Sequence, residues 1–119
     1  MLDRYVSGPV TRISPESPVP VVQVEREWAA VGGAANVAAN VVALGARCDV
    51  VGCVGSDDAG CELRERLRGL GVGIEGLVET AERPTTVKTR VMAGHQQVVR
   101  IDREDSHDVS PEAVRLLRM

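Results

Sequence analysis

The sequence predicts an α/β domain in which helices cover a parallel sheet and a smaller antiparallel sheet stands beside it. Apolar segments of helical and strand length alternate between residues 34 and 78, an order typical of α/β folds. Residues 49–54 are almost continuously apolar, as in strands that a parallel sheet buries on both faces. Residues 85–102 instead alternate apolar and polar side chains around Gly94-His95, which predicts an antiparallel hairpin.

Length and composition fit one globular domain. The chain has 119 residues, of which 44% are hydrophobic and 26% charged, enough for a single core. Tyr5 and Trp28 are the only aromatic residues, so Val, Leu and Ala must build the core and stacking on bases is disfavoured. The net charge of −3 also argues against a surface for nucleic acid.

The cysteines and a long uncharged segment bear on where in the cell the protein is found. Cys48, Cys53 and Cys61 form no C-x-x-C pair, which favours reduced thiols, a cytoplasmic protein and no metal site. The segment from Trp28 to Ala46 is uncharged and long enough to cross a membrane, but it is mostly alanine and glycine with two asparagines. We therefore expect no membrane segment.

The first thirty residues carry weak strand signals. Residues 1–5 read as the end of a strand followed by a loop. Four prolines within residues 6–20 predict an irregular, extended segment. Residues 21–30 alternate in polarity, which predicts one half-exposed strand.

The middle of the chain gives the clearest elements. Residues 34–44 predict a helix that is apolar nearly all round and so buried on several sides, with Gly45 at its end. After the strand at 49–54, Ser56 or Asp57 caps a second helix. An apolar stripe marks this helix, and Gly69 and Gly71 mark its end; the stripe consists of Ala59, Leu63, Leu67 and Leu70.

The last third predicts a strand at 74–78, a polar loop at 79–84 and the hairpin. We expect the hairpin to pair with the strand at 21–30. Ser110-Pro111 begins a further helix. Because the strand before residue 1 and the end of this helix are missing from the pattern, we expect the chain to be a fragment of a larger domain.

The segment around Gly32 and Gly33 is the strongest candidate for a binding site. Glycines let a ligand approach the backbone closely, and the first N–H groups of the following helix are free to donate hydrogen bonds. Asn36 lies about one turn into that helix. A hydroxylated ligand fits such a turn, although close packing of helix and sheet explains the glycines equally well.

Charged and polar residues elsewhere in the sequence do not individually indicate a binding site, because each has an ordinary structural explanation. Lys88 and Arg90 share a strand face and are able to grip a phosphate, or they form a solvated edge that prevents aggregation. Asp3 is either an acceptor for sugar hydroxyls or a solvated loop charge. Gln97 and Arg100 are ordinary surface positions by default, residues 102–105 a solvated turn, and His95 a turn residue.

Several blocks together resemble the ribokinase/PfkB carbohydrate kinase superfamily. The block G-G-A-A-N-V-A at 32–38 carries the superfamily likeness, supported by V-G-S-D-D-A-G at 54–60. The blocks R-I-S-P-E-S-P-V-P-V at 12–21 and Q-Q-V-V-R-I-D at 96–102 resemble the D-glycero-β-D-manno-heptose-7-phosphate kinases, which form the N-terminal part of bifunctional kinase/adenylyltransferases.

The resemblance implies part of a ribokinase-like doubly wound parallel sheet with a β lid over the sugar. It assigns about residues 6–30 and 85–102 to the lid, and about 31–84 and 103–119 to the α/β core. It also implies a cytoplasmic homodimer joined through the lid.

The same resemblance implies transfer of the ATP γ-phosphoryl group to the anomeric hydroxyl of heptose 7-phosphate, in ADP-heptose and lipopolysaccharide core biosynthesis. The substrate-binding residues are then Asp3, Gly32, Gly33, Asn36, Lys88, Arg90, Gln97 and Arg100. The catalytic Asp belongs to a G-A-G-D turn that this sequence does not contain; Gly55-Ser56-Asp57-Asp58 matches a different block. We therefore expect no catalytic residue here, ATP and Mg²⁺ bound by residues beyond these, and no turnover by the chain alone.

Two alternatives remain open. Another PfkB kinase, acting on ribose, fructose or a nucleoside, would share the glycine turn but would not need Lys88 and Arg90 to bind a phosphate on its substrate. A non-catalytic dimerising module would use the lid strands for self-association alone.

Overall fold

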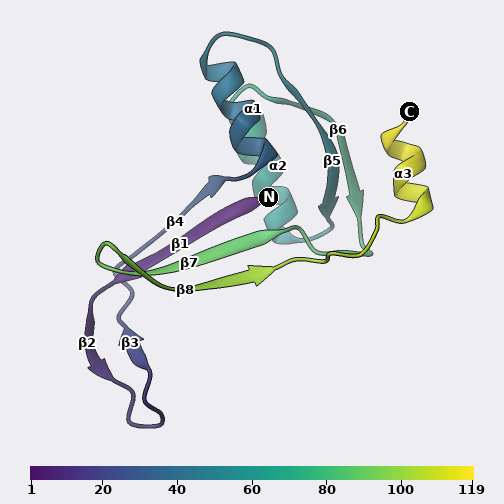
Figure 1. Ribbon diagram of the computed structural model, residues 1–119. Helices are drawn as coiled ribbons and strands as arrows, with labels where there is room; N and C mark the ends of the chain where they lie inside the picture. Colours follow the sequence, from purple (N-terminus) through teal and green to yellow (C-terminus); the bar gives the residue numbers. More distant parts are fainter.

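The computed structural model describes residues 1–119 as a four-stranded sheet beside an α/β unit (Figure 1). The strands are β1 (Leu2–Gly8), β2 (Val10–Ile13), β3 (Pro20–Val22), β4 (Arg26–Val31), β5 (Asp49–Gly55), β6 (Gly73–Thr80), β7 (Val87–Ala93) and β8 (Gln96–Arg103). The helices are α1 (Ala34–Ala43), α2 (Asp58–Gly69) and α3 (Pro111–Leu117).

The α/β unit contains the core. Strands β5 and β6 pair in parallel, as the apolar pattern predicts, and α1 and α2 lie on one side of them while α3 lies on the other (Figure 1). The core is built from small and branched side chains of both helices and both strands: Ala35, Ala38, Val54, Leu63, Leu67, Val72, Ile74 and Leu77. This is the α/β layer that the sequence predicts, without an aromatic residue in it.

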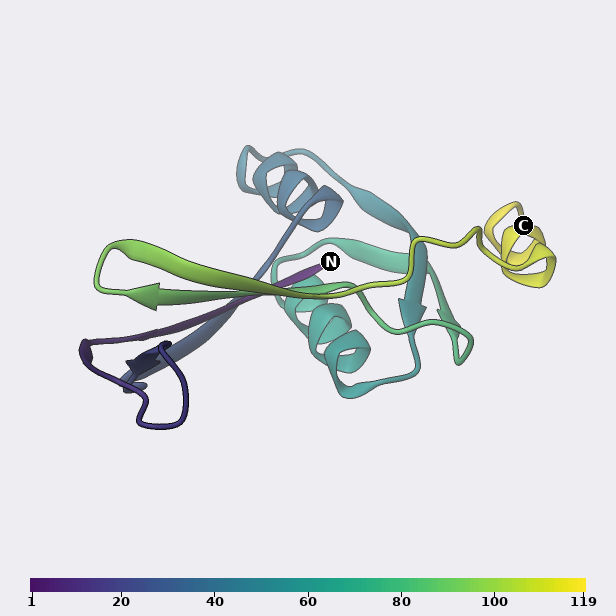
Figure 2. The same ribbon diagram turned by 60° about the horizontal axis from the view of Figure 1, so that its bottom comes forward.

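The four-stranded sheet has the order β4-β1-β7-β8. Its outer pairs, β1–β4 and β7–β8, are antiparallel, and its central pair, β1–β7, is parallel. Hairpin β2–β3 continues beyond one end of this sheet, away from the helices (Figures 1 and 2). Because side chains alternate along strands, Asp3 and Tyr5 share one face with Lys88 and Arg90, whereas Arg4 lies on the other.

The pairing of β1 corrects the expectation for the N-terminus. Residues 1–5 are not the end of a strand and a loop, since Leu2 to Gly8 form a central strand whose Leu2 is fully buried. Residues 6–20 complete β1 and form most of hairpin β2–β3, and 21–30 divide into β3 and β4. The hairpin β7–β8 pairs with β1, not with β4. These pairings are long-range, so local alternation did not indicate them.

The exposure of α1 and β5 differs from the prediction. Only Ala35 and Ala38 of α1 are buried, whereas Val37 is 61% exposed. On β5, Val51 is 66% exposed. Strand β5 pairs with β6 alone in its sheet, and α1 packs on the core through Ala35 and Ala38. No helix of the structure has the length and apolar character that a membrane span needs.

A small polar network joins α2 to the start of β7. The Asp57 carboxylate caps α2 by accepting a hydrogen bond from the Gly60 N–H at 2.8 Å, and it accepts two more from Thr85, from its N–H at 2.9 Å and its hydroxyl at 2.7 Å. The Thr85 hydroxyl in turn accepts the Gly55 N–H at 2.8 Å. Thr85 is the buried polar side chain of the fold, at 3% exposure, so this network fixes β7 against the core.

Replacing Asp57 by Ala should lower the free energy of unfolding by about 2–3 kcal/mol, because it removes a helix cap and leaves N–H groups without acceptors. Asp58→Ala is the matched control, since Asp58 is exposed in the first turn of the same helix and should cost about 0.5 kcal/mol. Urea unfolding of both variants measures this difference. Equal losses would contradict the role given to Asp57.

Stability should also fall on acidification. Burial alone would raise the pKa of Asp57, but hydrogen bonds from Thr85 and Gly60 outweigh it and hold that pKa below its ordinary value. A depressed carboxyl pKa contributes stability above the unfolded value of about 3.9, and this is lost as the pH falls through the folded-state value. Melting curves between pH 7 and pH 2.5 should therefore show a shallower pH dependence for Asp57→Asn than for the unmodified chain. Identical slopes would contradict the assignment.

Candidate functional site

Three distant segments meet where β1, β7 and the turn after β4 come together. Asp3 and Arg90 form an ion pair between neighbouring parallel strands, with Oδ1 and Nη1 3.0 Å apart, and their side chains are 15% and 24% exposed. Gly32 lies directly against the same carboxylate, because a Cβ built on Gly32 would stand 2.6 Å from Asp3 Oδ2. The structure thus brings together an acid, a cation and a bare backbone that the sequence predicted separately.

The ion pair leaves hydrogen-bonding capacity unused. Asp3 Oδ1 and Arg90 Nη1 are buried, yet neither makes an aligned hydrogen bond within the protein, although they are in ionic contact. Contact with the Asp3 carboxylate outweighs desolvation and raises the pKa of Arg90 above its ordinary value, so the guanidinium is charged. Buried polar atoms without aligned partners are uncommon in native proteins, so a polar ligand that reaches this pair would supply the aligned hydrogen bonds that the two side chains do not make with each other.

The first turn of α1 offers backbone donors beside this pair. Gly33 occupies the N-cap position with φ 56° and ψ −131°, and no side chain caps the helix. The N–H groups of Gly33 and Ala34 donate no hydrogen bond within the chain. Asn36 is exposed in the same turn, and its side chain makes no hydrogen bond to the protein. These groups are able to bind hydroxyl oxygens.

Lys88 and Arg100 are held by a shared acid. Asp102 lies opposite Lys88 in the β7–β8 register and receives its ammonium group at 3.4 Å, while Arg100 pairs with the same carboxylate at 2.9 Å. Desolvation raises the pKa of Asp102, but hydrogen bonds from Arg100 and Lys88 outweigh it and hold that pKa below its ordinary value. The expectation of a solvated turn at 102–105 is therefore wrong for Asp102 and Arg103, which belong to β8.

Gln97 and His95 take the positions that the hairpin gives them. Gln97 lies opposite Met92 after a bulge in β8, so it shares the face of Arg90 but stands nearer the hairpin tip. His95 is exposed in the tight turn, next to Gly94 with φ +61°. Neither residue contacts Asp3 or the glycine turn.

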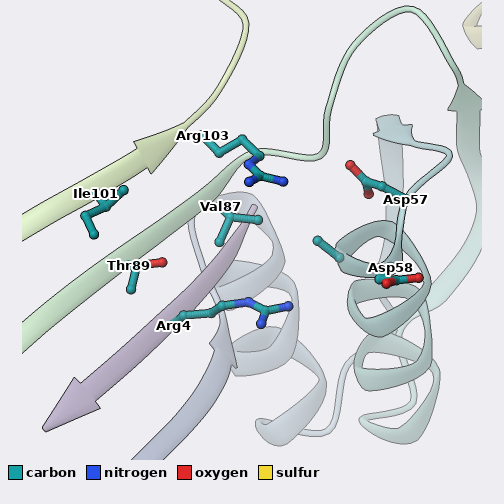
Figure 3. Close-up of a pocket in the computed structure, with 8 residues that line it drawn as sticks. Arg4, Asp57, Asp58, Val87, Thr89, Ile101 and Arg103 are labelled. Atoms are coloured by element: carbon teal, nitrogen blue, oxygen red, sulfur yellow. The ribbon is translucent and has the colours of Figure 1, made fainter. Parts of the chain in front are cut away.

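A hollow of about 410 Å³ lies on the other face of the sheet, between β1, β7 and β8 and the start of α2 (Figure 3). Arg4, Val87 and Thr89 stand on the sheet side, and Asp57 and Asp58 on the helix side. None of the predicted site residues lines it. Successive side chains of a strand point to opposite faces of the sheet, so Asp3, Lys88 and Arg90 lie on the face away from the hollow. The hollow therefore belongs to the junction between sheet and helix and not to the predicted site.

Sequence reasoning missed the two aromatic residues. Tyr5 and Trp28 are cross-strand partners whose rings stack, and the Arg90 guanidinium lies over the Tyr5 ring at 5.5 Å. One feature of the sequence did point to them. They are the only two aromatic residues, and both fall within the first thirty residues, outside the predicted core. Their stacking depends on the β1–β4 register, which the sequence did not reveal.

The fold defines a class of protein, because known structures share it. The fold matches Arabidopsis thaliana ribokinase, solved with ribose and ATP, with a TM-score of 0.68 and 23% identity over 85% of this chain and 32% of that one. It also matches a carbohydrate kinase from Agrobacterium tumefaciens, with a TM-score of 0.67 and 23% identity over 85% and 32% of the two chains.

The particular family follows from the sequence. Residues 2–118 match the model of the pfkB family carbohydrate kinases, and the chain belongs to this family. It is 50% identical over 115 residues to the bifunctional protein HldE of Geobacter sulfurreducens, and 51% identical over 110 residues to that of Citrifermentans bemidjiense. These alignments cover 97% and 92% of this chain but 24% and 23% of the relatives, so the chain spans about a quarter of their length.

Gly33→Ala should destabilise the chain by about 1–3 kcal/mol, because its backbone angles are strained for any residue with a Cβ. Gly69→Ala is the matched control, since a Cβ at Gly69 meets nothing within 4 Å and its φ is not positive. Thermal unfolding of both variants measures the effect. A Gly33→Ala variant as stable as Gly69→Ala would show that the turn does not need its unusual geometry.

Proposed function

We propose that this chain is the sugar-binding part of a kinase that transfers the γ-phosphoryl group of ATP to the C1 hydroxyl of D-glycero-β-D-manno-heptose 7-phosphate. One observation carries the proposal: Asp3, Arg90 and the Gly32-Gly33 turn converge from three segments and leave buried polar atoms without aligned partners. Membership of the pfkB family and the likeness to HldE proteins support it.

Each residue then has a distinct task. Asp3 accepts hydrogen bonds from sugar hydroxyls, and the free N–H groups of the α1 turn and the Asn36 amide bind further hydroxyls. Arg90 holds the 7-phosphate through a bidentate contact, and Lys88 adds a point charge. Gln97 and Arg100, nearer the free part of the hairpin, extend this polar surface over the substrate.

The four-stranded sheet acts as the lid in this proposal. Closure of a lid over the sugar expels water, which would otherwise compete with the acceptor hydroxyl for the phosphoryl group. We assign about residues 6–30 and 85–102 to the lid and the remainder from residue 31 onward to the core, and β1 extends the lid to residue 2.

The nucleotide belongs outside these residues. In the structure, no three His, Cys, Asp or Glu side chains are grouped as ligands for a metal ion. ATP donates the phosphoryl group, and we place ATP, Mg²⁺ and the catalytic base in the part of the family domain that this chain does not span.

The opposite face of the lid is available for self-association. Val99 and Ile101 of β8 are 48% and 57% exposed, and they share a face with Arg4 rather than with Asp3. On this face Ile101 lines the hollow beside α2, while Val99 lies nearer the tip of the β7–β8 hairpin. We propose a homodimer joined through the lid, in which this apolar strip contacts a second copy of the chain. Free cysteines agree with a cytoplasmic location.

Arg90→Ala should weaken binding of heptose 7-phosphate at least about tenfold, because it removes a charge-assisted contact worth about 1.5–3 kcal/mol. NMR titration of this chain measures the dissociation constant. A chimaera in which the chain replaces the matching segment of the Geobacter sulfurreducens relative gives the corresponding KM.

The control for this measurement is Arg68→Ala, since Arg68 is exposed at the end of α2 and far along the sequence from the site. Equal affinities of the Arg90 and Arg68 variants would contradict the phosphate grip. Phosphorylation of unphosphorylated sugars by the chimaera as readily as heptose 7-phosphate would favour another sugar kinase.

A further inference from the structure

The two aromatic residues of the chain occupy an unusual place. Large aromatic side chains are the strongest contributors to a core, yet the core here contains only Ala, Val, Leu and Ile. Tyr5 and Trp28 lie instead on the face of the sheet that carries Asp3 and Arg90, and Trp28 is 37% exposed. As a cross-strand pair the two rings stabilise the sheet, and they also lie beside Arg90.

The rings are arranged in a row with two guanidinium groups. Tyr5 and Trp28 stack with centroids 4.9 Å apart and planes 6° from parallel. The Arg90 guanidinium carbon lies 5.5 Å from the Tyr5 centroid, and that of Arg26 lies 4.5 Å from the Trp28 centroid. The row crosses β4, β1 and β7, so it depends on the pairing of all three strands.

Two groups thus restrict the Arg90 side chain. The Asp3 carboxylate contacts Nη1 at 3.0 Å, while the Tyr5 ring attracts the guanidinium through its π electrons. When a sugar hydroxyl donates a hydrogen bond to the Asp3 carboxylate, it competes with Arg90 and weakens the ion pair. The contact with the Tyr5 ring then keeps the Arg90 guanidinium oriented. A guanidinium that is already oriented loses less conformational entropy on binding a phosphate.

We propose that Tyr5, stacked on Trp28, is a positioning residue for Arg90 and thereby sets the affinity of the site for the phosphate group of a phosphorylated sugar. The proposal deepens the proposed function and rests on it. Tyr5 acts through Arg90 and takes no part in phosphoryl transfer.

The test compares Tyr5→Leu with Tyr5→Phe in the chimaera. Loss of the ring should raise the KM for heptose 7-phosphate about fivefold, the worth of a cation–π contact, with kcat and the KM for ATP within about twofold. Tyr5→Phe keeps the ring and should restore the KM. A leucine variant with unchanged KM, or one that lowers kcat and both KM values together, would overturn the positioning role.

A second measurement uses the unmodified chain and does not depend on how the variants fold. Trp28 is the only tryptophan, so its fluorescence reports on the row directly. Heptose 7-phosphate should change the emission of the unmodified chain saturably. Binding that NMR detects at Gly33 without any change in Trp28 emission would refute the inference.

The two proposals fail in different ways. If Arg90→Ala weakens binding of heptose 7-phosphate but Tyr5→Leu does not, the phosphate grip stands and the aromatic row has no part in it. If Arg90→Ala has no effect either, the proposed function itself fails.

Discussion

The contact between Asp3 and Arg90 is the interaction on which the geometry of the site depends. It joins two strands that lie far apart in the sequence but pair in parallel at the centre of the sheet. Gly32 has room beside the carboxylate only because it lacks a Cβ. An acid, a cation and exposed backbone amides therefore face one small region, and this arrangement is the basis of the proposed binding of a phosphorylated sugar.

The Asp57–Thr85 network gives this site its fixed position relative to the core. It anchors the start of β7 at the N-terminus of α2, two residues before the strand that carries Lys88 and Arg90 begins. Gly60 fits only without a Cβ, which would lie 2.2 Å from the Gly55 carbonyl oxygen. The free end of the sheet has no such anchor and extends away from the helices (Figure 2), which agrees with the lid role proposed for it.

Much of this arrangement was predictable from local patterns. Asp57 as a cap, the stripe of Leu63 and Leu67, and the turn at Gly94 each follow from a few neighbouring residues, and all are confirmed. The parallel pairing of β5 was indicated by its apolar run. The glycine turn was predicted as a binding site from its own residues and Asp3 through family resemblance, and the structure places them next to each other.

The rest could not be predicted because it depends on long-range pairing. The residues next to Leu2 in the sequence do not indicate that Leu2 is buried in a central strand, between β4 and β7. Likewise, the residues next to Tyr5 do not identify Trp28 as its cross-strand neighbour. Asp102 was likewise predicted to be a solvated charge. Its contacts with Lys88 and Arg100 depend on how β7 and β8 pair, which the sequence around Asp102 does not show. The exposure of Val37 and Val51 depends on which elements cover them.

The most direct test of the central claim is a crystal structure of the chain with heptose 7-phosphate. The account predicts the phosphate within hydrogen-bond distance of Arg90 and sugar hydroxyls at Asp3 and the Gly33 amide. A ligand bound instead in the hollow beside Arg4 and Asp58, on the opposite face of the sheet, would contradict it.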